Sequence, residues 1–166
     1  MLTLNCNAAT TKALGGIILL MIIEVHSEQA TRAFGEKIGR LLRGGETLEL
    51  NGDVGAGKTT FVKGLALGLD IDEDVQSPSF TISRVYDARD GLQLAHYDFY
   101  RLSDAGIMAD ELAETTQDPT TVTVIEWADI VEGVLPKDRL GIIFASPSET
   151  SRQLTITGPK DLLEKL

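Results

Sequence analysis

The sequence predicts an α/β protein of three layers, with helices flanking a central β-sheet of mixed strand direction. Strand and helix patterns alternate from Met21 to about residue 68, as expected where helices cover a sheet. A glycine-rich loop joins the second of these strands to the second helix. The chain that follows is rich in strand patterns and includes a hairpin. A hairpin adds antiparallel neighbours, so the sheet is expected to be mixed rather than purely parallel.

The first predicted strand covers residues 21–25. The apolar stretch around it, residues 14–25, is too short for a membrane span and lacks a basic leader and a small-residue cleavage site. We therefore expect no membrane attachment. We expect a single domain over residues 21–166 and treat residues 1–20 as an N-terminal extension outside the fold. An upstream start codon would explain such an extension, since Met21 is a natural beginning.

A helix and a second strand are predicted next. Ser27 suits the N-cap position, and Ala30, Phe34 and Ile38 recur at helical spacing until glycines 44 and 45 end the pattern. The following stretch, residues 47–51, alternates leucine with polar residues and predicts a strand.

The glycine-rich loop, GDVGAGKTTF, fits the pattern of a phosphate-binding loop, G-x-x-x-x-G-K-[ST], at Gly52, Gly57, Lys58 and Thr59. Glycines let backbone N–H groups turn inward around an anion, and the N-terminus of the next helix, residues 58–67, adds its dipole. Lys58 would neutralise the β- and γ-phosphates, and the Thr59 hydroxyl would bind Mg²⁺. The expected ATP-binding residues of the loop are Asp53, Val54, Gly55, Ala56, Gly57, Lys58, Thr59 and Thr60.

The second half of the chain predicts seven more elements and two turns. Phe80, Ile82 and Val85 form an extended run, and Leu92, Leu94 and His96 form another. Residues 88–91 join these two strands as a turn. The later elements are a helix over 103–116 capped by Ser103 or Asp104, a strand buried on both faces over 121–127, strands over 138–145 and 152–158 joined by a turn, and a short helix over 159–166.

Two acidic residues follow predicted strands, where ligands bind in open α/β sheets. Asp98 and Glu126 could each bind Mg²⁺ directly or through water, or position the water that attacks a phosphate. His96 suits a structural role better than a catalytic one, and Trp127 could pack in the core or beside the nucleotide. The segment Ser77, Pro78, Ser79, Phe80 and Thr81 could act as a switch that responds to the γ-phosphate. Arg152 could reach a phosphate or a base.

Composition limits the possible functions. The chain has 166 residues, enough for one domain, and a net charge of −10, which argues against strong nucleic-acid binding without a partner. The single cysteine, Cys6, can form neither a disulfide nor a cysteine zinc site within one chain. A cytoplasmic location is expected, since the cytoplasm is reducing and supplies ATP.

Four motifs together resemble one family, the bacterial threonylcarbamoyladenosine biosynthesis ATPases known as TsaE or YjeE. They are GDVGAGKTTF, SPSFT, HYDFYRL and VIEW, which begin at residues 52, 77, 96 and 124. The opening SEQATRAFGEKIG is also similar to the first helix of that family. The resemblance covers residues 21–158, nearly the whole chain.

The resemblance implies a small cytoplasmic ATPase that supports formation of threonylcarbamoyladenosine beside the tRNA anticodon. Its partner would be a TsaB–TsaD complex that performs the carbamoyl transfer, and its cofactors would be ATP and Mg²⁺. By position, Thr59 and Glu126 match Mg²⁺ ligands, Lys58 and the backbone of residues 53–60 match the phosphate cradle, and Asp98 matches a Walker-B-like acid. Residues 77–81 match the switch and Arg152 a late arginine near the nucleotide.

The chain also departs from the family, and other functions stay open. The helix after YRL lacks the paired glutamates and the glycine of the family pattern, which leaves its partner surface undefined. A small-molecule kinase is one alternative, although Arg84, Arg89 and Arg101 form no lid-like cluster in the sequence. A nucleotide-dependent binding module with little hydrolysis is another.

Overall fold

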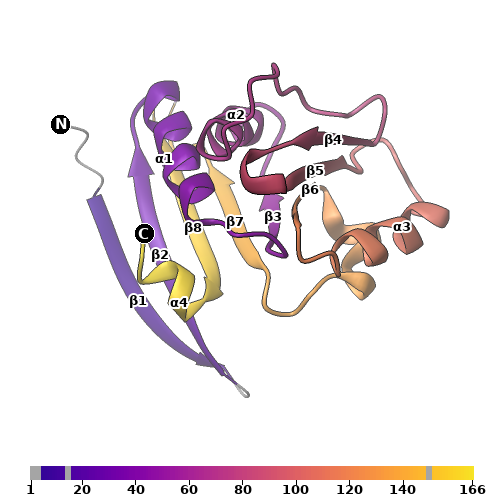
Figure 1. The fold of residues 1–166 in the computed structure, drawn as a ribbon. Coiled ribbons are helices and arrows are strands. Elements are labelled where there is room, and N and C mark those ends of the chain that lie inside the picture. Colours follow the sequence, from indigo (N-terminus) through magenta and orange to yellow (C-terminus); the bar gives the residue numbers. More distant parts are fainter. Residues whose placement is uncertain (1–4, 14–15, 149–150) are drawn as a thin grey trace.

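The computed structural model describes residues 5–13, 16–148 and 151–166, with side chains from residue 20 onward. It confirms the three-layer α/β fold (Figure 1). Eight strands form one mixed sheet in the order β1-β2-β8-β7-β3-β6-β5-β4. The strands are β1 (Asn5–Ala13), β2 (Gly16–Val25), β3 (Thr47–Asn51), β4 (Ser83–Asp87), β5 (Gln93–Asp98), β6 (Thr121–Glu126), β7 (Leu140–Ala145) and β8 (Arg152–Pro159).

The middle of the sheet is parallel and its flanks are antiparallel. Strand β3 pairs in parallel with β6 and β7, and β5 pairs in parallel with β6. The hairpin partner β4 runs antiparallel to β5, and β8 runs antiparallel to β7 and β2. Strand β2 begins before Met21 and pairs with β1. That the domain proper starts at Met21 stays a prediction, since pairing alone does not measure what residues 16–20 contribute to stability.

Each face of the sheet packs against helices through its own hydrophobic core, which gives the three layers. Along β5 and β6, side chains alternate between the faces of the sheet. Leu94 and Val124 join a core with helices α1 (Glu28–Leu41) and α2 (Lys58–Gly68). Tyr97 and Ile125 face the other way. They join a core with α3 (Ile107–Thr115) and the 3₁₀ segment η2 (Ala128–Val134). A short 3₁₀ turn, η1 (Arg89–Gly91), closes the β4–β5 hairpin, and α4 (Lys160–Leu163) ends the chain.

Helices α1 and α2 lie side by side (Figure 1). A methyl group added to Gly64 would lie 2.0 Å from the carbonyl oxygen of Arg32, and one on Gly35 would lie 2.2 Å from that of Phe61. Glycine therefore permits the two backbones to touch. The contact holds α2 against α1, and with it the glycine-rich loop that leads into α2.

Most predicted elements are confirmed, and three boundaries were wrong, the first being the start of β2 at Gly16 rather than Met21. The hydroxyl of Ser27 caps α1 by accepting a bond from the N–H of Ala30 at 3.0 Å. The hairpin strand does not include Phe80 or Ile82, because a turn over Pro78–Ile82 delays β4 until Ser83. Helix α3 starts at Ile107, and neither Ser103 nor Asp104 caps it.

The described helices lack the combined length and apolar character needed to cross a membrane.

Candidate functional site

The carboxyl ends of β3, β5 and β6 meet at one edge of the sheet, because these strands are parallel neighbours. Strand β3 leads at this edge into the glycine-rich loop. Asp98 ends β5 and Glu126 ends β6, and the two are partners in the sheet register. Two residues separated widely in sequence thus lie beside the loop, as their position after the strands predicted.

The loop has the backbone geometry of an anion cradle. Gly52, Gly55 and Gly57 take φ values of 144°, 81° and 107°, a region that favours glycine. A methyl group added to Gly55 would meet no protein atom within 4 Å. The loop therefore faces open space with its backbone, where a ligand of the size of a phosphate could lie.

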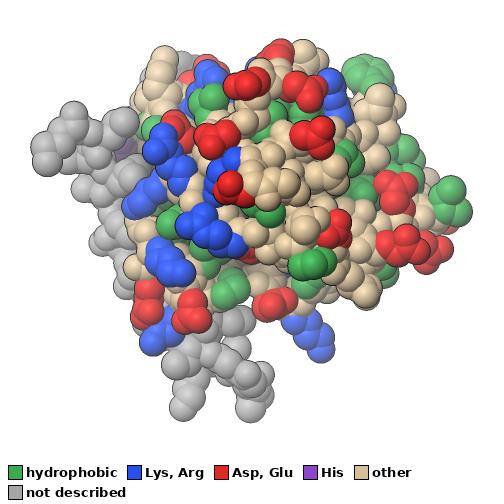
Figure 2. All heavy atoms as spheres, viewed as in Figure 1, with side chains coloured by type: hydrophobic (Ala, Val, Ile, Leu, Met, Phe, Trp, Pro, Cys, Tyr) green, Lys and Arg blue, Asp and Glu red, His purple; other side chains and the backbone are tan. Residues whose placement is uncertain are grey.

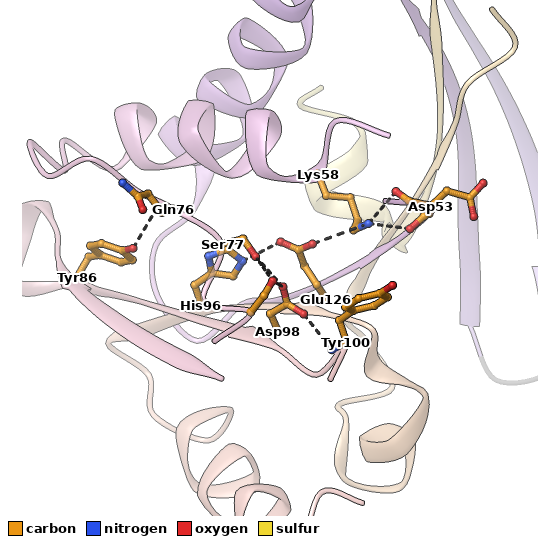
Figure 3. Close-up of polar contacts among 11 residues, drawn as sticks. Asp53, Lys58, Gln76, Ser77, Tyr86, His96, Asp98, Tyr100 and Glu126 are labelled. Atoms are coloured by element: carbon orange, nitrogen blue, oxygen red, sulfur yellow. Dashed lines mark hydrogen bonds and ion pairs between the residues drawn. The ribbon is translucent and has the colours of Figure 1, made fainter. Parts of the chain in front are cut away.

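Lys58 lies at the centre of the site and is 5% exposed. Its ammonium group donates to the carbonyl oxygens of Gly52, at 2.7 Å, and Asp53, at 3.1 Å (Figure 3). It also lies 3.9 Å from Oε2 of Glu126 and 4.7 Å from the centre of the Trp127 ring. These contacts direct a buried cation toward the space between the loop and the ends of the strands.

Trp127 directly follows Glu126 and adopts a left-handed backbone conformation, with φ of 58° and ψ of 51°. Such a conformation is unfavourable for a bulky residue, and strained residues of this kind cluster at functional sites. Here it turns the indole under Lys58 and against Tyr100, whose ring centre lies 4.9 Å away. The single tryptophan of the chain is therefore part of the wall of the site.

Asp98 and Glu126 have different partners. The Asp98 carboxylate accepts hydrogen bonds from the hydroxyls of Ser77, at 2.6 Å, and Ser79, and from the backbone N–H of Tyr100 at 3.0 Å. Glu126 instead contacts Nε2 of His96 at 3.0 Å. Both acids are buried, each with an exposure of 3%. Asp98 thus holds the segment after α2, and Glu126 lies between Lys58 and His96 (Figure 3).

These groups open onto a cavity of about 420 Å³. An exposed arginine, Arg101, stands at its mouth with the guanidinium 4.3 Å from the centre of the exposed Phe80 ring. The residues that line the cavity are Val54, Gly55, Gly57, Lys58, Thr59, Thr60, Ser77, Ser79, Phe80, Asp98, Tyr100, Arg101, Glu126 and Trp127.

A second cavity, of about 380 Å³, also adjoins the loop. It shares Gly55, Gly57 and Thr60 with the first cavity, so an elongated ligand held on the loop could extend into both. The remaining residues that line it are His26, Ser27, Glu28, Thr31 and Arg152.

The structure brings most of the predicted site residues together. In the loop, the backbone carbonyl oxygen of Asp53 accepts from Lys58 and from the N–H of Ala56, and the buried Ala56 packs in the core. In the switch segment, Ser77, Ser79 and Phe80 line the first cavity, whereas Pro78 and Thr81 are not among its lining residues. Arg152 lies in the second cavity instead, where it donates to the carbonyl oxygen of Ser151 at 2.9 Å.

Sequence reasoning missed several residues that line the cavities. Tyr100 and Arg101 belong to the motif HYDFYRL, so their proximity to Asp98 was an available signal. Glu28, the first residue of α1, and His26, just before that helix, gave no signal, because the helix was predicted only as a covering element.

The donor set fits a magnesium ion that is bound together with phosphate. In the described part of the chain, no group of three or more His, Cys, Asp or Glu side chains could hold a metal alone. Mg²⁺ is usually bound by one or two carboxylates together with substrate phosphates and water, and needs no such cage. Thr59 and Glu126 both line the cavity, and the hydroxyl of the first and the carboxylate of the second could supply the protein ligands.

Comparisons with known proteins agree on one family. Residues 25–154 match the family model "Threonylcarbamoyl adenosine biosynthesis protein TsaE". The chain is similar to the "tRNA threonylcarbamoyladenosine biosynthesis protein TsaE" of Treponema pallidum, at 42% identity over 78% of this chain and 95% of that protein. It is also similar to the protein of the same name from Bacillus subtilis, at 38% identity over 83% and 85%. Among solved structures it resembles Bacillus subtilis YdiB, with a TM-score of 0.73 and 33% identity over 91% of this chain and 96% of YdiB.

Proposed function

The chain belongs to the TsaE family of threonylcarbamoyl adenosine biosynthesis proteins, and from this premise we propose that it binds and hydrolyses ATP in that pathway. One observation carries the proposal. The buried Lys58 joins the glycine-rich loop to Glu126, the acid that ends the neighbouring strand. A loop lysine beside a strand-end carboxylate is the arrangement that P-loop NTPases use to hold phosphates and Mg²⁺.

The two cavities suggest how ATP would lie. The phosphates would rest on the loop, with the γ-phosphate in the cavity that contains Lys58, Asp98 and Glu126. The base and ribose would then lie in the cavity lined by Glu28 and Arg152. Thr59 and Glu126 would hold Mg²⁺, which would neutralise charge that builds up on the phosphate oxygens.

The reaction would be an in-line attack of water on the γ-phosphorus. Lys58 and the N–H groups of the loop would stabilise the negative charge of the transition state, and they need little rearrangement because the fold already holds them in place. Asp98 or Glu126 would position the attacking water. The exposed Arg101 at the mouth of the same cavity could approach the γ-phosphate from the open side.

The kinase alternative has less support. Of the three arginines in the region after α2, Arg84 pairs with Glu73 at 3.6 Å, and Arg89 donates to the carbonyl oxygens that end α1 and α2. Only Arg101 of these three lines the cavity. A kinase lid needs several cations that close over the transferred phosphate, and this region does not gather them.

We further propose that the protein acts in the cytoplasm through a TsaB–TsaD type complex and does not hold tRNA strongly by itself. The net charge of −10 supports a protein partner. Figure 2 shows both charge signs on one face of the molecule, with lysine and arginine side chains gathered near α1. The exposed Arg32, Lys37 and Arg40 belong to that helix. Tight tRNA binding by the isolated chain, sensitive to loss of these three cations, would contradict this part of the proposal.

The deciding experiment is Mg²⁺-dependent ATP hydrolysis by the purified chain, with and without the TsaB–TsaD pair from the same source. Weak hydrolysis that rises with the pair and is lost in Lys58→Ala is the expected result. Lys63→Ala is the matched control, because Lys63 is on the same helix but half-exposed and paired with Asp74 at 3.6 Å. Hydrolysis that survives in Lys58→Ala would refute the site, and ATP binding with no turnover even with the pair would favour a binding module.

Glu126→Ala provides a second test. The variant should fold but lose Mg²⁺-dependent turnover, because Thr59 alone would remain as a protein ligand. Loss of folded protein would instead mean that the carboxylate serves the structure.

A further inference from the structure

His96 and Glu126 form a buried pair beside the nucleotide cavity. Nε2 of His96 lies 3.0 Å from Oε1 of Glu126, and the imidazole is 0% exposed. The two side chains share a face of the sheet, since His96 is two residues before Asp98, the register partner of Glu126. Glu126 lines the cavity, whereas His96 is not among its lining residues. His96 therefore does not face a ligand in the cavity directly, but it contacts Glu126, which does (Figure 3).

The surroundings of the imidazole assign its proton. A carboxylate only accepts hydrogen bonds, so the hydrogen lies on Nε2 of His96 and is donated to Glu126. Nδ1 is buried and has no hydrogen-bond partner among the described residues. With its hydrogen on Nε2, the ring leaves Nδ1 as an unused acceptor, which is less costly than an unused N–H donor would be.

An unused buried acceptor still lowers stability, because it has given up its hydrogen bonds to water. A leucine at this position would fill the core without that cost. We therefore infer that the imidazole serves a purpose other than packing. Its Nε2 contacts Glu126, the carboxylate proposed to hold Mg²⁺.

The two carboxylate oxygens of Glu126 have different partners. Oε1 accepts from His96, and Oε2 faces Lys58 at 3.9 Å. The last torsion of a glutamate side chain has a broad energy minimum, so a carboxylate without an anchor would rotate. An anchor on one oxygen fixes the plane of the group and directs the other oxygen toward Lys58 and the loop.

We propose that His96 is a positioning residue, whose Nε2–H anchors one oxygen of Glu126 so that the other is directed at Lys58 and the metal–phosphate site. The proposal rests on the proposed ATPase function. It also assigns different work to the two acids. Both acids end strands of the sheet, but the carboxylate of Glu126 is anchored by His96, whereas that of Asp98 accepts the hydroxyls of residues 77 and 79 and holds that segment.

The test uses three substitutions of His96 in the full chain. His96→Gln places an amide nitrogen near the Nε2 position and should keep metal affinity and turnover within about threefold of the parent protein. His96→Asn places its nitrogen near Nδ1, too far to reach Glu126. His96→Leu removes the donor. Both of these variants should lose about 10- to 100-fold in metal affinity or turnover, the usual effect of losing the partner of a metal ligand.

Two measurements do not depend on turnover. The first is the affinity for Mn²⁺ in the presence of ADP, with metal-free ADP binding followed by the fluorescence of Trp127. Metal affinity should fall in His96→Asn and His96→Leu, while metal-free ADP binding stays unchanged. The second is the ¹⁵N spectrum of the imidazole in the protein without ligand, which should show a hydrogen on Nε2.

The outcomes separate the two proposals. If the parent protein neither hydrolyses ATP nor binds Mn²⁺–ADP in a way that Glu126→Gln weakens, the proposed function fails and the role of His96 fails with it. If the parent is active but His96→Asn and His96→Leu match it in metal affinity and turnover, only the role of His96 is overturned. A proton on Nδ1 would also overturn it. If His96→Leu does not fold, the contrast between His96→Gln and His96→Asn still decides.

Discussion

The hydroxyl of Ser77 donates to the carboxylate of Asp98 at 2.6 Å and thereby ties the segment after α2 to the end of β5. Ser79 adds a second hydroxyl to the same oxygen. The segment ends at Ile82, which has a φ of 70°, unfavourable for a branched side chain, and whose carbonyl oxygen accepts the N–H of Asp98 at 2.8 Å. The carboxylate therefore holds a strained segment against the cavity that is proposed to receive the γ-phosphate.

We expect the double substitution Ser77→Ala with Ser79→Ala to loosen this segment alone. Each hydrogen bond to a charged group is worth about 1.5–3 kcal/mol, so amide exchange of residues 77–82 should rise by tenfold or more. Hydrogen–deuterium exchange with peptide resolution measures the change, and the exposed Ser103→Ala is the control. Exchange in this segment equal to that of the parent protein, or a general rise across α1 and α2, would show that the two hydroxyls do not hold the segment.

The contact between α1 and α2 leads to a prediction on stability. Gly64→Ala would force a methyl group to within 2.0 Å of the Arg32 carbonyl oxygen, and two helix backbones would have to separate. Overpacking of this kind costs about 1–3 kcal/mol, and backbone contact places this variant at the upper end. Chemical denaturation measures the loss. Gly133→Ala is the control, because a methyl group there would meet nothing within 4 Å; equal stability of the two variants would mean that the helices shift at little cost.

Arg89 joins the turn of the β4–β5 hairpin to α1 and α2, the two helices that cover one face of the sheet. Its guanidinium donates to the carbonyl oxygens of Gly68, of Gly39 at 3.2 Å and of Leu42 at 3.0 Å, which lie at the ends of α2 and α1. These carbonyl groups lack partners within their own helices, and a cation also suits the negative end of each dipole.

Arg89→Ala should therefore lower the free energy of unfolding by about 2 kcal/mol. Arg84→Ala is the matched control, because its side chain is 48% exposed and its ion pair with Glu73 is solvated. Denaturation of both variants under one set of conditions makes the comparison, and a loss in Arg84→Ala as large as in Arg89→Ala would contradict the role assigned to Arg89.

Local sequence patterns were enough to predict an element where its hydrophobic pattern or capping residue matches its burial or its end in the structure. Strand β6 is a run of branched residues buried on both faces, and the Ser27 cap is visible in the sequence. The start of β4 was misplaced because Phe80 and Ile82 favour a strand, whereas the turn closed by the Pro78 carbonyl oxygen holds them outside it. The start of α3 was misplaced because Asp104 bonds the N–H of Gly106 before the helix begins.

The candidate site was predictable residue by residue but not as a set of contacts. The positions of Asp98 and Glu126 after strands indicated a shared edge. Their partners depend on sheet register and on a loop conformation, and the contacts span 21 residues for Ser77–Asp98 and 30 for His96–Glu126. No periodic pattern within one element encodes such pairs. The glycines that bring α1 and α2 together were overlooked for the same reason, since their purpose is visible only against the opposite helix.

Tyr97 connects β5 to α3 and leads to a prediction on alkaline stability. Its hydroxyl donates to Glu111 at 3.1 Å and contacts the hydroxyl of Thr115 at 2.9 Å, and the side chain is buried. Burial raises the pKa of Tyr97 above its usual value of 10.0, and the nearby charge of Glu111 raises it further, against a lowering contribution from Thr115.

The direction in which stability changes with pH follows from the number of protons that Tyr97 binds in the folded and unfolded states. Between the usual pKa and the raised pKa of the folded state, unfolding releases the tyrosine proton, so stability falls as the pH rises. The stabilisation is fully present below about pH 10 and is lost as the pH rises through the folded pKa. Tyr97→Phe should thus be less stable near neutral pH, where the hydrogen bonds are lost, but its stability should decline less steeply above pH 10. Denaturation across this pH range measures the slope, with the exposed Tyr100→Phe as control; equal slopes in the two variants would show that another group causes the alkaline loss.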